Sequence, residues 1–185
     1  MKKNIIVVLS LFFLIFGHLL AQKNNCIDAK TQKIIKSITK GCRPEPSVYL
    51  SQKCIDKHLK KFSEGASFFI PKDVLDRFGR KILGRNDGQF VIPTKEMNRL
   101  IKKSKGSLTY IETELGIPAG AWKDKIIIRI DILELSELNI RLPNGNEAGA
   151  NELWIPGGKL PKGYSEAVVN PIPEGKYRET IVDLK

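Results

Sequence analysis

The sequence predicts an α+β fold in which an N-terminal helical segment precedes a small, mostly antiparallel sheet with helices. Residues 27–62 carry apolar side chains at helical spacing, whereas short apolar stretches rich in β-branched and aromatic residues recur from residue 66 onward. Glycine and proline separate these stretches. We therefore expect a signal peptide at 1–21, a helical N-terminal segment at 22–62 and an α+β domain at 63–185.

The first residues have the order of a secretory signal peptide. Lys2 and Lys3 precede an apolar run at 5–20, and the small residue Ala21 comes before a polar stretch. The run is shorter than the roughly 20 apolar residues that a membrane-spanning helix needs. We predict a secreted or periplasmic protein with no stable membrane insertion after cleavage, and an uncleaved membrane anchor is the alternative.

The N-terminal segment is expected to hold two helices. Ile34, Ile35 and Ile38 form the apolar face of a helix at 28–40, which Gly41 would end, and a second helix is expected between residues 48 and 62. An oxidising compartment favours one disulfide, but the sequence leaves the pairing open among Cys26, Cys42 and Cys54. No metal site is expected, because no Cys-x-x-Cys pair is present and one histidine follows residue 21.

The domain is predicted to alternate strands and helices. Strands are expected at 66–70, 89–92, 126–132, 167–169 and 177–184. Helices are expected after Pro71, from a Thr94 cap to residue 105, and from a Ser107 cap to Gly116. Arg129 and Asp131 share one face of their strand, where they are either exposed to solvent or paired in a cleft.

A long loop at 141–164 and the residues after it form the candidate site. Asn146, Asn151, Gly157 and Gly158 offer amide groups and close backbone approach, and Arg141 offers a cation. Glu147 and Glu166 supply carboxylates, which can activate a nucleophile or stabilise positive charge developing on a sugar carbon. The alternative is structural, since Asn and Gly also form ordinary turns.

Three motifs carry a resemblance to a known family. They are Asp-Gly-Gln-Phe-Val-Ile-Pro at 87–93, Asn-Gly-Asn-Glu-Ala-Gly-Ala-Asn-Glu at 144–152 and Trp-Ile-Pro-Gly-Gly at 154–158. With them, residues 58–169 resemble a C-terminal domain of bacterial polymorphic toxins of the Rhs and contact-dependent-inhibition types. The resemblance implies a toxin or effector and a cognate immunity protein as partner. Such domains usually end a large delivery protein, whereas here a signal peptide stands in front.

The order of the glycine-rich loop and the late-strand Glu166 is also similar to ADP-ribosyltransferase-like and NAD-hydrolysing toxins. That similarity implies NAD as a substrate rather than a cofactor, Glu166 on the nicotinamide ribose, and Arg85 or Arg129 near the pyrophosphate. Glu166, Glu147, Arg129 and His58 are the expected catalytic residues; their convergence on one cleft would favour an enzyme, and their dispersal would count against one.

Two other functions stay open. The net charge of +11, His58 and the available Lys and Glu residues favour a metal-independent ribonuclease toxin acting on an RNA substrate. The absence of a strong catalytic motif favours a non-catalytic exported module that binds a partner through the 141–164 loop. The sequence alone does not decide whether the protein is an enzyme.

Overall fold

The computed structural model describes residues 26–184, so the predicted signal peptide lies outside the described residues. Within them the chain forms five α-helices, a five-stranded antiparallel sheet and a two-stranded antiparallel sheet, which confirms the predicted α+β fold. None of the helices in residues 26–184 is long and apolar enough to cross a membrane.

The helices begin close to where the sequence predicts them. They are α2 (Ala29–Ser37), α3 (Gln52–Leu59), α4 (Lys72–Phe78), α5 (Thr94–Ser104) and α6 (Leu108–Leu115), with short 3₁₀ turns η1 (Pro46–Val48) and η2 (Lys60–Phe62). The Ser107 side chain accepts from the Tyr110 N–H and caps α6 as predicted.

Two predicted helix ends are wrong. The chain leaves α2 at Ile38, which has an extended backbone, so Gly41 does not end that helix. Thr94 is the first residue of α5 rather than its cap, and its hydroxyl lies 3.0 Å from the Ser67 hydroxyl instead of bonding to the helix.

The large sheet has the order β5-β3-β1-β4-β7, with β1 at its centre. Its strands are β1 (Ala66–Pro71), β3 (Gln89–Pro93), β4 (Ile127–Ile132), β5 (Ala167–Val169) and β7 (Tyr177–Val182). The small sheet pairs β2 (Ile82–Leu83) with β6 (Ile172–Pro173), two strands that the sequence did not predict. Both are only two residues long, too short for a pattern of alternation to show.

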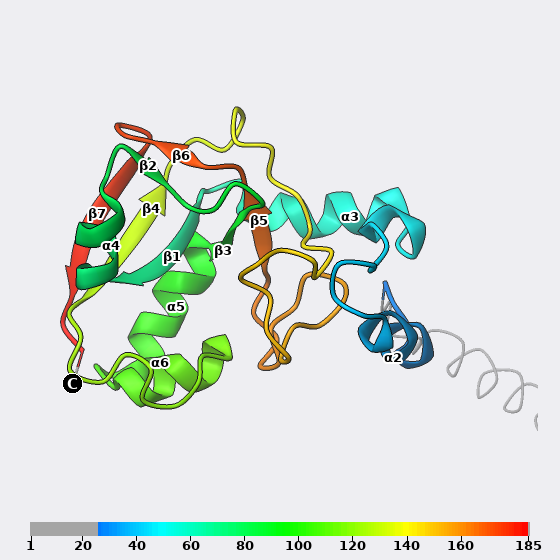
Figure 1. Cartoon of the computed structure of the whole chain (residues 1–185), viewed down its shortest axis with the longest axis horizontal. Coiled ribbons are helices and arrows are strands. Elements are labelled where there is room, and N and C mark those ends of the chain that lie inside the picture. The colour runs from blue at the N-terminus through cyan, green and yellow to red at the C-terminus, as the bar shows by residue number, and fades with distance from the viewer. Residues whose placement is uncertain (1–25, 185) are drawn as a thin grey trace, which may run out of the picture.

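Side chains on opposite faces of β1 enter two different cores. Ala66 and Phe68 join Leu75 of α4 in one core, whereas Phe69 joins residues of α5 and α6, among them Met97, in the other. This split follows from the alternation of side chains along a strand. In Figure 1, α5 lies beside the central strands, and much of the loop at 141–164 lies between the large sheet and the N-terminal helices.

The N-terminal helical segment packs on that loop. Ile35 of α2 shares a buried cluster with Ala150 and Trp154, and the Arg43 guanidinium lies 4.6 Å from the centre of the Trp154 ring. A disulfide joins Cys26 to Cys54 in α3 and leaves Cys42 as an exposed free thiol. The N-terminal helical segment therefore packs against the 141–164 loop and covers it.

Candidate functional site

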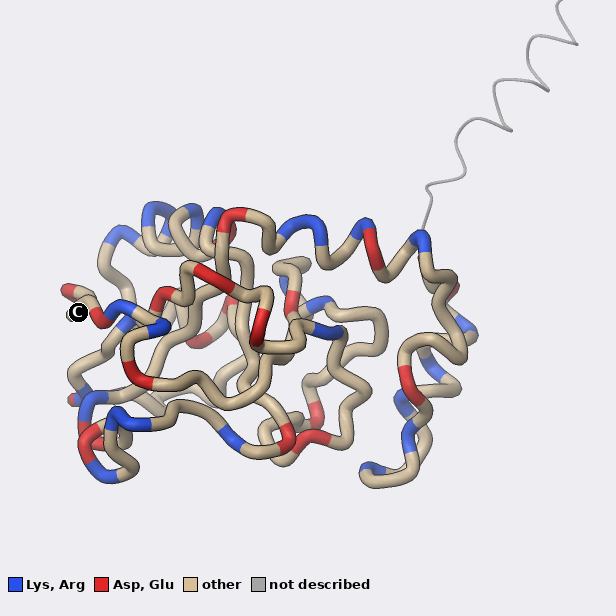
Figure 2. Tube along the Cα trace, turned by 90° about the horizontal axis from the view of Figure 1, so that it is seen from above, with Lys and Arg blue, Asp and Glu red and all other residues tan. Residues whose placement is uncertain are grey.

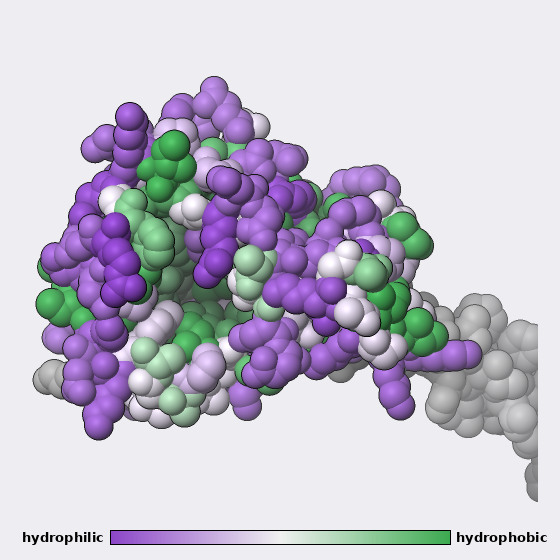
Figure 3. All heavy atoms as spheres, in the orientation of Figure 1, coloured by the Kyte–Doolittle hydropathy of each residue, from purple (hydrophilic) through white to green (hydrophobic). Residues whose placement is uncertain are grey.

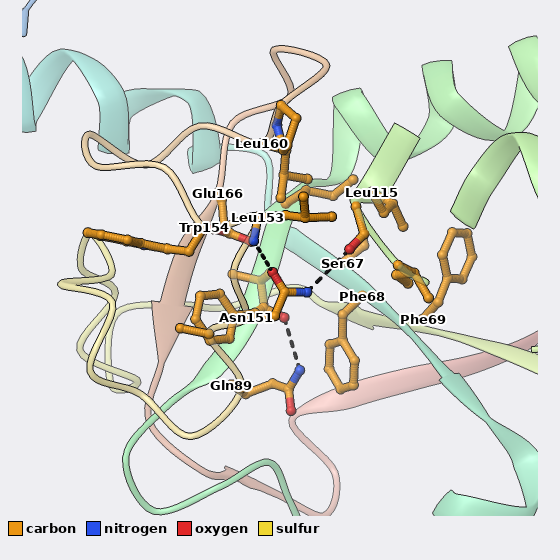
Figure 4. A pocket seen from close by; sticks show the side chains of 18 of the residues that line it. Ser67, Phe68, Phe69, Gln89, Leu115, Asn151, Leu153, Trp154, Leu160 and Glu166 are labelled. Atoms are coloured by element: carbon orange, nitrogen blue, oxygen red, sulfur yellow. Dashed lines mark hydrogen bonds between the residues drawn. The ribbon is translucent and has the colours of Figure 1, made fainter. Parts of the chain in front are cut away.

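A pocket of about 210 Å³ opens between the large sheet, the end of α6 and the 141–164 loop. The face drawn in Figure 3 is hollowed near its centre, and apolar side chains line the hollow. In Figure 4, Asn151 lies centrally, with Phe68 and Phe69 on one side and Trp154 on the other. The aromatic side chains of the lining are Phe68, Phe69, Phe90, Trp122 and Trp154, and its polar side chains are Ser67, Gln89, Asn151 and Glu166.

Glu166 is the acidic residue of this lining. It directly precedes β5 and is 9% exposed, and among the described residues its carboxyl group has no hydrogen-bonding or ion-pairing partner. Burial, and to a smaller extent the charge of Glu147, raises the pKa of Glu166 to about 8. At neutral pH the pocket is therefore lined by a protonated, uncharged carboxylic acid.

The backbone of Glu166 is held on both sides. Its N–H donates to the Gly158 carbonyl (2.8 Å), and its own carbonyl lies 2.9 Å from Nε2 of His58. Burial lowers the pKa of His58 to about 4, so the ring is neutral at pH 7 and Nε2–H is the donor of this bond. His58 is thus a positioning residue behind Glu166 and does not line the pocket, so it does not join Glu166 in one cleft.

Gly158 is required where the chain passes these two groups. A Cβ at this position would lie 2.9 Å from the Glu166 carbonyl oxygen and 2.9 Å from Nε2 of His58, and the backbone φ is +69°. Only glycine suits both the contact and the left-handed backbone. Gly157 beside it packs against Ile27 of the N-terminal segment, so neither glycine contacts the pocket.

Asn151 does line the pocket, and it also joins two parts of its rim. Its Nδ2 donates to the Gly116 carbonyl at the end of α6 (3.3 Å), while its Oδ1 accepts from the Leu153 N–H (2.9 Å). The predicted role of Asn151 in binding is consistent with this position.

Arg129 is paired and mostly buried, which decides between the two alternatives that the sequence left open. Its guanidinium lies 2.8 Å from Oδ1 of Asp131, and the two side chains are 14% and 15% exposed. The same Asp131 oxygen accepts from the Ser67 hydroxyl (2.5 Å), and Ser67 lines the pocket. Arg129 is therefore connected to the pocket only through Asp131 and Ser67 and does not line it.

Glu147 and its neighbours hold the loop instead of lining this pocket. The Glu147 carboxylate accepts from the N–H groups of Asn144 (3.0 Å) and Gly145 (2.9 Å), which closes a turn. Asn146 accepts from the N–H groups of Gly41 and Arg43 and thereby ties the loop to the N-terminal segment.

Arg141 is likewise occupied, because it donates to the Asn170 side chain (3.1 Å) and the Asp87 carbonyl (3.0 Å). Together with Glu147 and Asn146 it borders a second cavity of about 240 Å³. Arg85 is exposed and lines neither cavity.

The four predicted catalytic residues thus do not converge on one cleft: Glu166 lines the pocket, and Glu147, Arg129 and His58 support structures around it. The sequence analysis missed Ser67, Gln89 and Trp122. The motif at 87–93 contains Gln89, but nothing local showed that this strand lies beside the late loop.

Among residues 26–184, no group of three or more His, Cys, Asp or Glu side chains is arranged to hold a metal ion. No protein-family model, curated protein or solved structure matches the chain.

Proposed function

We propose that the pocket is the active site of a secreted toxin or effector that cleaves the bond between nicotinamide and ribose in NAD, passing ADP-ribose to water or to another acceptor. The observation that carries this proposal is Glu166, a residue only 9% exposed whose carboxyl lines an aromatic pocket and has no protein partner among the described residues. An unpaired buried acid is costly to a fold, and such groups concentrate at functional sites.

The size and walls of the pocket favour a single charged ring. At about 210 Å³ it is smaller than the roughly 300–1,000 Å³ of pockets that enclose whole drug-sized ligands. Nicotinamide in NAD is a planar cation, and a cation is attracted both by aromatic faces and by a carboxylate. We infer that the nicotinamide ring enters the pocket, which Asn151 also lines, and that the rest of the dinucleotide stays outside it.

The chemistry needs Glu166 as a carboxylate. A cationic ring beside the group lowers its pKa, so that the proton leaves as the substrate binds. The bond between C1′ and the ring nitrogen then breaks, and its electron pair makes nicotinamide neutral. Positive charge moves to the ribose, where the carboxylate stabilises it. Water adds to C1′ and gives its proton to Glu166 or to solvent.

The position of His58 counts against the ribonuclease alternative, in which this histidine would act as the base. His58 is 6% exposed, its Nε2 is engaged with the Glu166 carbonyl, and burial lowers its pKa to about 4. A histidine placed in this way cannot reach the 2′-hydroxyl of a bound RNA.

The test is release of nicotinamide from NAD by the purified protein. We expect Glu166→Gln to lower kcat about 10²- to 10³-fold, the range found when one charge-stabilising group is removed from an active site. The matched control is Glu152→Gln, which makes the same chemical change at an exposed position of the same loop and should keep full activity. Equal activity in the parent and Glu166→Gln would refute the proposal. Binding of NAD without turnover would favour the non-catalytic module instead.

The toxin context has a separate test in living cells. Growth arrest of a bacterium that makes the protein, relieved by Glu166→Gln at equal abundance, would support it. Arrest that persists in this variant would show that toxicity does not come from the pocket.

A further inference from the structure

Two helical elements carry a row of exposed cations that the proposed NAD chemistry does not use. In the view from above, Lys and Arg positions follow one edge of the molecule (Figure 2). We call this row the basic ridge. Its members in α3 and η2 are Lys53, Lys57, Lys60 and Lys61. Its members in α5 are Lys95, Arg99, Lys102 and Lys103.

The two halves of the ridge meet in space. Ser165 is fully buried and joins them, because Nζ of Lys61 lies 3.0 Å from its hydroxyl and the Glu96 carboxylate of α5 accepts from the same hydroxyl (3.1 Å). Lys159 of the long loop also donates to this hydroxyl (3.0 Å). The two groups of cations therefore lie on adjoining elements, η2 and α5, that Ser165 connects.

Few acids neutralise the ridge. Among the described residues, its one ion pair joins Lys95 to Glu64 at 4.0 Å, and both of those side chains are largely exposed. Burial, and after it the neighbouring cation of Lys159, lowers the pKa of Lys61 to about 8, although the Glu96 carboxylate opposes this shift. Cations crowded in this way repel one another, and a bound polyanion would relieve the repulsion.

The ridge also lacks the apolar side chains that a membrane-binding helix inserts. The large hydrophobic residues that are exposed on the described chain include Ile34, Phe78 and Leu153, and none of the exposed ones lies in α3, η2 or α5. Helices that bind lipid surfaces bury an apolar face in the bilayer. Exposed cations without an apolar face instead suit the phosphate backbone of a nucleic acid, which is bound mainly through charge.

We propose that the basic ridge binds the phosphate backbone of a nucleic acid, as a surface distinct from the NAD pocket. Because lysines dominate and no aromatic side chain of α3 or α5 is exposed, binding depends on charge and not on base sequence. If half of the eight cations contact phosphates of a single strand, affinity falls about 50-fold between roughly 50 and 200 mM salt.

The experiment measures the fluorescence anisotropy of a labelled single-stranded RNA of about 20 nucleotides, a length that exceeds common single-strand sites. A DNA duplex and anionic vesicles are the parallel probes. The ridge variant changes Lys57, Lys60, Lys95 and Arg99 to Gln, and the control variant changes Lys30, Lys36, Lys81 and Lys123 to Gln, so both lose four exposed cations.

We expect the ridge variant to bind RNA or DNA at least tenfold more weakly and with a shallower salt dependence, while the control variant binds like the parent. Preference between the RNA and DNA probes identifies the nucleic acid. Equal loss in both variants would show that net charge alone matters, and binding to vesicles alone would assign the ridge to a membrane; either result overturns the proposal. NAD cleavage is measured separately, so failure of one proposal leaves the other open.

Discussion

Replacing Glu166 by Gln should make the protein more stable at alkaline pH, even though it removes the proposed catalytic group. The Glu166 carboxyl is 9% exposed and has no partner among the described residues, so its charged form is disfavoured in the folded state. Gln has nearly the same shape and stays neutral at every pH. The variant therefore isolates the cost of the charge from the cost of altered packing.

The magnitude follows from proton linkage. Folding raises the pKa of Glu166 from 4.5 to about 8, so between these values the unfolded chain has released a proton that the folded chain still holds. Stability from this group is fully present below pH 4.5 and is lost as pH rises toward 8. At about 1.36 kcal/mol per pKa unit, the loss approaches about 5 kcal/mol as an upper value.

Urea denaturation at pH 5 and at pH 8.5 measures this difference. We expect the free energies of unfolding of the parent and Glu166→Gln to be close at pH 5 and to separate by several kcal/mol at pH 8.5. Glu152→Gln, at an exposed position, should follow the parent at both pH values. A parent and a Glu166→Gln variant that lose stability in parallel would show that the carboxyl is solvated or paired, and the reasoning would fail.

Three more predictions concern the groups around Glu166. Glu147→Gln removes the charge that helps to raise the pKa of Glu166, so the acid limb of kcat/KM for NAD should move to lower pH, and a limb that stays at about pH 8 would contradict this. Gly158→Ala places a Cβ 2.9 Å from two atoms at a positive φ and should lower the thermal midpoint by several degrees, whereas Gly163→Ala, also at positive φ but with open space, should cost less. Cys26→Ser with Cys54→Ser opens a disulfide that spans 28 residues and should lower the free energy of unfolding by about 3 to 4 kcal/mol, whereas Cys42→Ser should have little effect in the same denaturation assay.

Most elements could be predicted because their signals are local. The strand β4 has alternating and β-branched residues, and the hydroxyl of Ser107 marks the start of α6 within four residues of sequence. The prediction that Thr94 caps α5 was wrong because the Thr94 hydroxyl bonds to a residue distant in sequence. The Thr94 hydroxyl, at the start of α5, is hydrogen-bonded to the Ser67 hydroxyl in β1.

The candidate site was predicted in part for the same reason. Glu166 could be selected because it follows a glycine-rich loop and directly precedes an apolar strand, and its side chain lines the pocket. Glu147 looked equally suitable, but its carboxylate is used by two backbone N–H groups of its own turn. Arg129 and Asp131 form an ion pair with each other on one face of β4. The sequence places both residues on that face, but only the structure shows that their side chains are largely buried there.

The loop that forms the pocket wall has little secondary structure of its own, so other parts of the chain must hold it in place. Its ladder contacts in the described chain are isolated bridges such as Ile155 with Lys159, while Asn146, Trp154 and Gly158 each contact the N-terminal segment or His58. The backbone of Glu166 is hydrogen-bonded to Gly158 and His58, but none of the contacts that hold the loop involves its carboxyl. The backbone of Glu166 is therefore fixed while its carboxyl has no protein partner among the described residues, and under the proposed function a cation or a hydrogen-bond donor that enters the pocket would supply that partner.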